Sequence, residues 1–259
     1  MPLVRSSLDG GVGTLVLDDP AHRNALSAKL IAGILGALEG FRGAKARAVV
    51  LRAAPGSRTW SSGHDVRELP TDGRDPLTWA DPLRVAVRRI EHFPAPVIAL
   101  VEGGVFGGAC ELLMACDLVV AAEGSTFAIT PARLGVPYNV AGTLTFMRST
   151  PLPAVKELLF RGRPIDAARA LAIGMVNHVV PAARLEATVA EILLDVLQNA
   201  PLTISLLKEE IQVLAESHPL NPEAFERVQE LRRRIYDSAD YREGIRAFLE
   251  KRRPVFRGE

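Results

Sequence analysis

The chain has 259 residues, of which 48% are hydrophobic and 24% charged, and its formal net charge is +1. This composition indicates a globular protein of one large domain, or one domain with an appendage, and so small a charge gives no electrostatic reason to expect nucleic acid as a partner. The N-terminal residues lack an apolar signal core and no apolar run could span a bilayer, so we expect a cytoplasmic protein without membrane contact.

Strand and helix patterns alternate along the first half of the chain. Helical spacing of apolar residues predicts helices over 27–41, with Ser27 as N-cap, and over 82–93. Between them, 54–69 is expected to begin as a polar loop and turn helical, with Asp65 as the cap. Short apolar runs predict strands over 13–19, 46–53, 95–101 and 118–122. This alternation favours an α/β architecture.

Strand patterns end after about residue 195. Residues 200–216 and 221–252 are expected to be helical, separated by a turn around SHPLNP. This last part either packs on its own core or on a neighbouring subunit, and the aromatic and basic residues at its end favour the second. Two basic runs, 231–236 and 250–256, are expected to be solvated helix faces or subunit contacts.

The two cysteines are not expected to form a disulfide with each other. Cys110 and Cys116 are six residues apart in a helical stretch, a spacing that does not put them on one face. Histidines and cysteines also show no metal-ligand spacing, so no metal is expected.

Two glycine-containing loops carry the most chemical information. VEGGVFGGACELLMACD (101–117) predicts a strand, a glycine turn at Gly107 and Gly108, and a helix. The first N–H groups of such a helix are unpaired and suit an anion or a developing oxyanion, although the glycines alone are equally consistent with tight packing.

The second loop lies in WSSGHDVREL (60–69), where Ser61 and Gly63 precede His64. It also offers backbone N–H groups at a helix start, and alone His64 is better explained as a hydrogen-bonded surface histidine. Together the two loops could offer two N–H groups to one oxygen, but their spacing in the sequence does not show that they converge.

Five stretches occur in the order typical of the crotonase, or enoyl-CoA hydratase/isomerase, superfamily, which the chain resembles over nearly its whole length. They are RNALS (23–27), SSGHDVREL (61–69), VEGGVFGGACELLMACD (101–117), STFAITPARLGVPY (125–138) and DAARALAIGMVNHVV (166–180). The resemblance implies an α/β fold with a crotonase-like spiral of ββα units and a C-terminal α-helical trimerisation region. We accordingly expect a core for acyl-CoA binding and catalysis in 1–195, an oligomerisation region in 196–259, and a homo-hexamer built as a dimer of trimers.

The resemblance also implies an acyl-CoA thioester as ligand. Backbone N–H groups of His64 and Gly108 are expected to bind the thioester oxygen, with Gly63 and Gly107 beside them. Arg23, Ala25 and Ser61 match coenzyme A-binding positions, and Phe248 and Lys251 match a tail segment that reaches a neighbouring subunit's coenzyme A. For Arg23 and Lys251, ordinary surface charge is a serious alternative.

The chain departs from the hydratase pattern at the second catalytic acid. Glu111 matches the first glutamate of the hydratases, but FAITPARLG (127–135) places Pro131 at the second, and neither Thr130 nor Ala132 is acidic. Hydration needs acid–base groups within reach of both a water and the α-carbon. A single carboxylate therefore argues against a hydratase.

A second departure is Tyr138 of GVPYNVAG (135–142), which stands where hydratases usually have glycine. With TPARLGVPYN, VKELLF and YDSADYREGIRAFLEKRRPVF, it resembles the methylmalonyl-CoA decarboxylase branch of the superfamily. That resemblance implies formation of propionyl-CoA through a thioester enolate, with neither biotin nor a metal. Tyr138 is expected to hold the departing carboxylate out of the thioester plane, with Thr130 as a possible neighbour, unless Tyr138 merely packs.

The proton donor to the enolate carbon is left open between the His64 side chain and a water. Because an ionised carboxylate would repel the substrate carboxylate, Glu111 is expected to be turned away, hydrogen-bonded to backbone or protonated, and it is either catalytic or an inherited structural residue. The rival functions are an enoyl-CoA isomerase or hydratase-type enzyme that uses Glu111, and a non-catalytic acyl-CoA- or RNA-binding relative.

Overall fold

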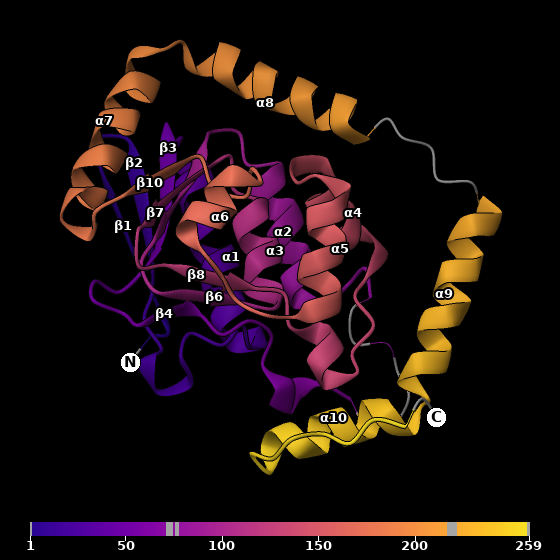
Figure 1. Cartoon of the computed structure of the whole chain (residues 1–259). Coiled ribbons are helices and arrows are strands. Elements are labelled where there is room, and N and C mark those ends of the chain that lie inside the picture. Colours follow the sequence, from indigo (N-terminus) through magenta and orange to yellow (C-terminus); the bar gives the residue numbers. More distant parts are fainter. Residues whose placement is uncertain (1, 71–74, 76–77, 217–221, 258–259) are drawn as a thin grey trace.

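The structure, a computed structural model, describes residues 2–70, 75, 78–216 and 222–257. Within these residues, two β-sheets lie at the left of the view, with helices packed beside them at the centre and further helices around the outside (Figure 1). The larger sheet runs in the order β1-β2-β3-β5-β7-β10, with β1 antiparallel to β2 and the other neighbours parallel. Its strands are β1 (Val4–Asp9), β2 (Val12–Leu17), β3 (Ala48–Ala53), β5 (Val97–Val101), β7 (Leu118–Ala122) and β10 (His178–Val180).

The smaller sheet has four strands, three of which directly follow a strand of the larger sheet along the chain. Its order is β4 (Thr59–Ser61), β6 (Gly104–Phe106), β8 (Thr126–Ala128) and β9 (Ile165–Asp166). Three successive units each give one strand to each sheet and then a helix: β3, β4 and α2 (Pro82–Glu91), then β5, β6 and α3 (Gly108–Met114), then β7, β8 and α4 (Val140–Ser149). This repetition is the expected spiral of ββα units.

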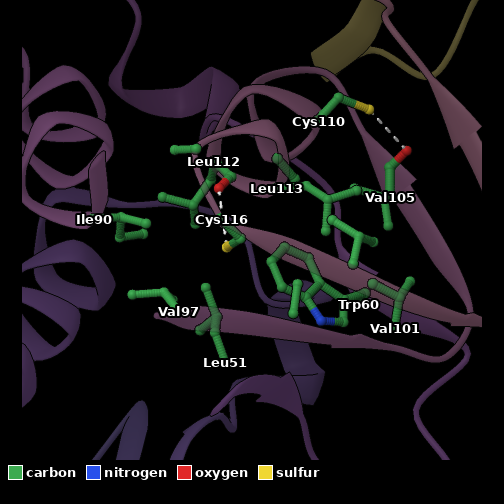
Figure 2. Packing of buried hydrophobic residues seen from close by; sticks show 14 of the residues in the cluster. Leu51, Trp60, Ile90, Val97, Val101, Val105, Cys110, Leu112, Leu113 and Cys116 are labelled. Carbon is green, nitrogen blue, oxygen red and sulfur yellow. Dashed lines mark hydrogen bonds between the residues drawn. The ribbon is translucent and has the colours of Figure 1, made fainter. Parts of the chain in front are cut away.

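Apolar side chains from both sheets and from α2 and α3 meet in one core (Figure 2). Trp60 is fully buried there, and its indole N–H donates to the Leu100 carbonyl at 3.0 Å. The two cysteines form no disulfide with each other, as predicted; both are buried, and burial raises the pKa of the Cys110 thiol to about 12. The Cys110 thiol donates to the Val105 carbonyl at 3.4 Å, so it behaves as a packing group with no available thiolate.

The elements predicted in the first half of the chain are confirmed. Strand β7 has the predicted bounds, β3 and β5 each begin two residues later than predicted, and β2 begins one residue earlier and ends two residues earlier. Helix α1 (Ala28–Gly43) begins after Ser27, whose hydroxyl accepts from the Leu30 N–H at 3.2 Å. Asp65 caps the segment after His64 through the Arg67 N–H, but the helix there is a single 3-10 turn (Val66–Glu68).

The second half of the described chain is mostly helical. After α4 come α5 (Leu152–Arg161), α6 (Ala167–Ala172), α7 (Leu185–Gln198), α8 (Pro201–Glu216), α9 (Pro222–Tyr236) and α10 (Ala239–Leu249). The predicted helix over 200–216 is α8. The segment 221–252 forms two helices because Ser238 starts α10 as its N-cap, accepting from the Tyr241 N–H at 3.1 Å. The predicted turn at SHPLNP lies largely outside the described residues.

The C-terminal helices lie around the outside of the core, with α8 along one side, α9 along the next and α10 below it (Figure 1). Lys208 attaches α8: its ammonium donates to the carbonyls of Ile90 and Ala95 and pairs with Asp117 at 2.6 Å. No single helix among the described residues is long and apolar enough to cross a membrane. Taken together, α7 and α8 have the length and composition of a span, but they are bent by 105° relative to each other. The division at 195/196 stays a prediction, and α7 ends close to it.

Candidate active site

The two glycine loops predicted to carry the chemistry do meet. Gly63 has a φ of +84°, and a Cβ atom there would lie 2.3 Å from the Phe106 carbonyl oxygen and 3.0 Å from the Gly108 nitrogen. A Cβ atom at Gly108 would lie 3.6 Å from the His64 nitrogen. Only glycine fits at Gly63, because both the backbone angle and the space exclude a side chain.

The contact between the loops puts two backbone donors side by side. Gly108 is the first residue of α3, so its N–H has no partner in a preceding turn. Gly107 sets the entry to the helix with a φ of +56°, and its own N–H donates to the Ala128 carbonyl at 2.8 Å. Neither the Gly108 nor the His64 N–H donates to another group in the described part of the chain. Such a pair can bind one oxygen atom and stabilise negative charge on it.

The predicted coenzyme A contacts lie beside these donors. The Arg23 carbonyl accepts from the Ser62 N–H at 3.0 Å, and the Ser61 hydroxyl donates to the Asn24 carbonyl at 2.7 Å. These bonds hold Arg23 and Ala25 next to the loop of Ser61 and Gly63. Ser61 and Ala25 are buried and Arg23 is exposed, and the Ser61 hydroxyl is used in a hydrogen bond within the fold.

The His64 imidazole is held between two acceptors. Nδ1 lies 3.3 Å from the Asp65 carbonyl and Nε2 lies 3.4 Å from an oxygen of Asp81. Burial works to lower the pKa of His64, but the hydrogen bond and charge of Asp81, the Asp65 carbonyl and the charge of Glu68 outweigh it, and the pKa is raised above 6.5. A cavity of about 310 Å³ adjoins this pair, lined by Leu26, Ala28, Ile31, His64, Glu68, Pro70, Thr78, Ala80, Asp81 and Pro82.

Glu111 is buried, with 1% of its side chain exposed, and its carboxylate has three partners. The guanidinium of Arg84, 7% exposed, forms an ion pair with Oε1. On Oε2 it accepts from the Tyr138 hydroxyl at 2.9 Å and the Asn139 amide at 3.4 Å. The carboxylate is therefore charge-compensated and hydrogen-bonded, an arrangement suited to holding other groups in place.

Helix α4 is shaped to allow this network. Asn139 is its N-cap, and its side-chain oxygen accepts from the Gly142 N–H at 2.6 Å, which leaves the amide group to face Glu111. A Cβ atom at Gly142 would lie 2.7 Å from Oε2 of Glu111 and 2.6 Å from the Tyr138 ring. Gly142 therefore lets the Glu111 carboxylate and the Tyr138 ring approach each other.

Tyr138 keeps its proton at physiological pH. Burial and the neighbouring charge of Glu111 raise the pKa of its hydroxyl well above 10. The ring packs on Phe146 with centroids 5.8 Å apart. Thr130 is close to Gly107, since its hydroxyl oxygen would lie 3.3 Å from a Cβ atom there. The network thus adjoins the glycine loop through α3, which carries both Gly108 and Glu111.

The predicted tail contacts lie elsewhere in the chain. Phe248 is in the last turn of α10, half-exposed, and Lys251 follows the helix with a φ of +56°. Their predicted role involves a neighbouring subunit and stays a prediction.

Comparisons with known proteins agree with this geometry. The family model described as enoyl-CoA hydratase/isomerase matches residues 7–259. The chain belongs to the enoyl-CoA hydratase/isomerase family. It is 48% identical over 235 residues to methylmalonyl-CoA decarboxylase of Escherichia coli K12, covering 91% of this chain and 90% of that protein.

Two solved structures of methylmalonyl-CoA decarboxylase superimpose on it with a TM-score of 0.97 at 45% identity. One is in complex with 2-nitronate-propionyl-CoA and covers 99% of each chain. The other, complexed with 2S-carboxypropyl-CoA, covers 100% of this chain and 99% of that chain. The expected superfamily and fold class are thereby confirmed.

Sequence reasoning missed four residues of this site: Arg84, Asp81, Asn139 and Gly142. A signal existed for Arg84, because it precedes Val87 by three residues and so falls on the apolar face of the predicted helix 82–93, where an arginine needs a buried partner. Asp81, which directly precedes Pro82, could have been predicted as a helix N-cap, but the contacts of Asp81 with His64, of Asn139 with Glu111 and of Gly142 with Tyr138 depend on other elements. Among the described residues, no group of three or more His, Cys, Asp or Glu is placed to hold a metal ion.

Proposed function

We propose that this protein decarboxylates methylmalonyl-CoA, or a close malonyl thioester, to propionyl-CoA. The observation that carries the proposal is the pair of N–H groups at His64 and Gly108 that no other group in the described chain accepts from, in a chain that has Pro131 at the second acid and Tyr138 where hydratases usually have glycine. The 48% identity to methylmalonyl-CoA decarboxylase supports it. That the reaction uses neither biotin nor a metal, and that the protein works in the cytoplasm, remain predictions.

In the proposed reaction the thioester oxygen accepts hydrogen bonds from the N–H groups of His64 and Gly108. The bond between the α-carbon and the carboxylate breaks, CO₂ leaves, and the electron pair forms an enolate whose negative oxygen those donors stabilise. They are fixed by the loop contact before the reaction, so little reorganisation accompanies the charge development. The α-carbon then takes up one proton to give propionyl-CoA. The imidazole of His64, whose raised pKa favours the protonated form, and a water remain the two candidate donors.

Tyr138 is proposed to orient the substrate carboxylate. Its single hydroxyl proton is directed at Glu111 in the structure, and it can serve only one acceptor at a time. Rotation of the O–H bond would turn it to the substrate, while Arg84 and Asn139 stay on Glu111. When CO₂ leaves, the electron pair of the broken bond carries the negative charge from the substrate carboxylate to the enolate oxygen, where the N–H groups of His64 and Gly108 stabilise it.

The same network argues against the rival enzymes of this fold. A single-base isomerase would need Glu111 free to take and return a proton at a substrate carbon. Its carboxylate instead faces Arg84, Tyr138 and Asn139, and the position of the second hydratase acid is Pro131. Glu111 is therefore best explained as a fixed acceptor that holds Tyr138, and a direct catalytic role stays a prediction.

The substrate assay separates these functions. Purified protein incubated with methylmalonyl-CoA should yield propionyl-CoA and CO₂, measured by mass spectrometry, with malonyl-CoA and ethylmalonyl-CoA as parallel substrates. Crotonyl-CoA should give little or no 3-hydroxybutyryl-CoA, and a 3-enoyl-CoA should not be isomerised. Robust hydration would show that the second acid is not required here, and isomerisation without CO₂ release would favour the isomerase.

We also propose that the chain forms a hexamer, with a trimer as the fallback. Helix α8 exposes a row of large apolar residues, with 84% of Leu202 and 66% of Ile211 accessible in the single chain, together with Leu206, Leu207, Val213 and Leu214. An exposed apolar surface of this kind marks an interface, and a second copy of the chain is the partner that the resemblance to the superfamily favours. This helix belongs to the region that we assign to oligomerisation, 196–259.

Light scattering at micromolar concentration should give the mass of a hexamer or trimer. Ile211→Glu should shift it towards smaller species, because a charge would be buried at the interface. Glu210→Gln, one residue away, should leave the assembly intact. A monomeric wild-type protein would count strongly against the tail role of Phe248 and Lys251.

A further inference from the structure

Helices α9 and α10 pack against two segments of the candidate site. One segment follows His64 and the other precedes Tyr138. Tyr236 ends α9 and Tyr241 lies in the first turn of α10; both are fully buried, and their rings meet edge to face at 5.2 Å. They share an apolar cluster with Val66, Leu69, Val136 and Ile245. Val66 and Leu69 follow His64, and Val136 precedes Tyr138, so this cluster joins the C-terminal helices to both sides of the site.

Each tyrosine hydroxyl donates to a proline carbonyl in a different loop. Tyr241 donates to the Pro70 carbonyl at 2.8 Å, at the end of the His64 segment. Tyr236 donates to the Pro137 carbonyl at 3.3 Å. The Pro137 carbonyl belongs to the peptide group whose nitrogen is that of Tyr138. The bond from Tyr236 therefore acts directly on the orientation of the Tyr138 backbone.

The hydroxyl of Tyr236 is itself held in place. Arg232, buried in α9, forms a two-pronged pair with Asp75 at 2.9 and 3.0 Å and donates to the Tyr236 oxygen at 3.3 Å. Burial and the neighbouring Asp75 carboxylate raise the pKa of the Tyr236 hydroxyl, so it keeps the proton that it donates to the Pro137 carbonyl, with Asp75 as a second acceptor beside it. Arg232 belongs to the basic run 231–236, which was predicted to be a solvated face or subunit contact; for this residue the prediction is wrong, because it has a partner inside the fold.

The backbones of the same segments are in direct contact. A Cβ atom at Gly244 of α10 would lie 2.0 Å from the Leu134 carbonyl oxygen. Gly135 has a φ of +66°, and a Cβ atom there would lie 2.8 Å from the Asp240 carbonyl oxygen. With no side chain between them, α10 and the start of the 134–138 loop fix each other's position. The hydrogen bond from Tyr236 to Pro137 restrains the same loop at the residue directly before Tyr138.

We propose that Tyr236 is a positioning residue for the decarboxylation, acting through the Pro137 carbonyl on Tyr138. This inference rests on the proposed role of Tyr138. It gives the C-terminal helices a function inside their own subunit, in addition to assembly.

The test is a double-mutant cycle that measures methylmalonyl-CoA decarboxylation and propionyl-CoA binding. Tyr138→Phe should lower kcat by about 10- to 100-fold, as expected for loss of a hydrogen bond to a charged group. Tyr236→Phe should lower kcat by about three- to tenfold, as expected for loss of a neutral bond, with an unchanged Kd for propionyl-CoA. In the Tyr138→Phe background, Tyr236→Phe should have little further effect, because the group that it positions is gone.

Tyr241→Phe is the matched control. It also removes a tyrosine hydroxyl from this cluster, but that hydroxyl binds the Pro70 carbonyl in the segment after His64. Its effect on kcat should be the same in the wild-type and Tyr138→Phe backgrounds. If the Tyr236→Phe factor were also the same in both, Tyr236 would act only on general stability and the inference would be wrong. If the kcat of Tyr138→Phe were lowered while the kcat of Tyr236→Phe equalled that of the wild type, this inference alone would be overturned. If the kcat of Tyr138→Phe equalled that of the wild type, the proposed role of Tyr138 would be overturned as well.

Discussion

Replacing Arg84 by methionine should lower the free energy of unfolding by about 3–5 kcal/mol, the usual cost of removing one partner of a buried ion pair. Arg84 and Glu111 are 7% and 1% exposed, so the variant would leave a carboxyl group buried without its ion-pair partner and without access to water. Urea unfolding followed by the fluorescence of the buried Trp60 measures the change. The loss would identify Arg84 as the residue that makes a buried carboxylate tolerable in the middle of the site.

Two further variants make this result specific. Arg84→Met combined with Glu111→Leu should recover most of the lost stability, since a buried pair can be replaced by apolar groups at little cost. Arg161→Met, which breaks the exposed pair between Arg161 and Glu157, should change stability by no more than about 1 kcal/mol. A similarly small loss for Arg84→Met would mean that the Glu111 carboxylate does not depend on its counter-charge, and the account of Glu111 as a fixed acceptor would need revision.

This pair also shows why the sequence could not settle the role of Glu111. The sequence places a carboxylate in an apolar helix, which predicts that it is buried with a partner or carries chemistry. The partner, Arg84, is 27 residues earlier in α2, and only the packing of α2 on α3 brings the two together. Tyr138 and Asn139 reach the same carboxylate from the start of α4. Local patterns do not contain such contacts between elements.

The fold was more accessible from the sequence than the site. Strands β3, β5 and β7 could be predicted because each is a short apolar run that is buried almost throughout, and α1 because its apolar residues recur at helical spacing. Strand β1 was missed. Its sequence, VRSSLD, has only two apolar residues, Val4 and Leu8, and so shows no alternation of apolar and polar residues. Five of its six residues are exposed because the strand lies at the sheet edge. The break between α9 and α10 depends on the Ser238 cap, which a continuous helical pattern conceals.

The convergence of the two glycine loops is the part of the site that sequence spacing could suggest but not demonstrate. It follows from the spiral of ββα units: β4 and β6 are parallel neighbours, so the segments leaving them end at the same edge of the small sheet. The His64 and Gly108 N–H groups come from those two segments. Their approach is therefore set by sheet topology, and the glycines permit the contact without producing it.

Gly63→Ala should consequently lower kcat for methylmalonyl-CoA decarboxylation by about 100-fold or more, the range for loss of one oxyanion-hole donor. The added methyl group would lie 2.3 Å from the Phe106 carbonyl oxygen and 3.0 Å from the Gly108 nitrogen, so the loops must separate. Separation moves the His64 and Gly108 N–H groups apart, and one oxygen could no longer accept from both at good distance.

A positive backbone angle at Gly63 adds strain to this substitution, and Gly56→Ala controls for it. Gly56 has a φ of +76°, close to that of Gly63, but a Cβ atom there would meet nothing within 4 Å. Gly56→Ala should therefore cost about 1 kcal/mol of stability from the backbone angle and leave kcat nearly unchanged. Decarboxylation rates and propionyl-CoA dissociation constants are measured for both variants. If Gly63→Ala kept its kcat within tenfold of the wild type while folding normally, close contact between the loops would not be needed, and the proposal that their two N–H groups stabilise the enolate would fail.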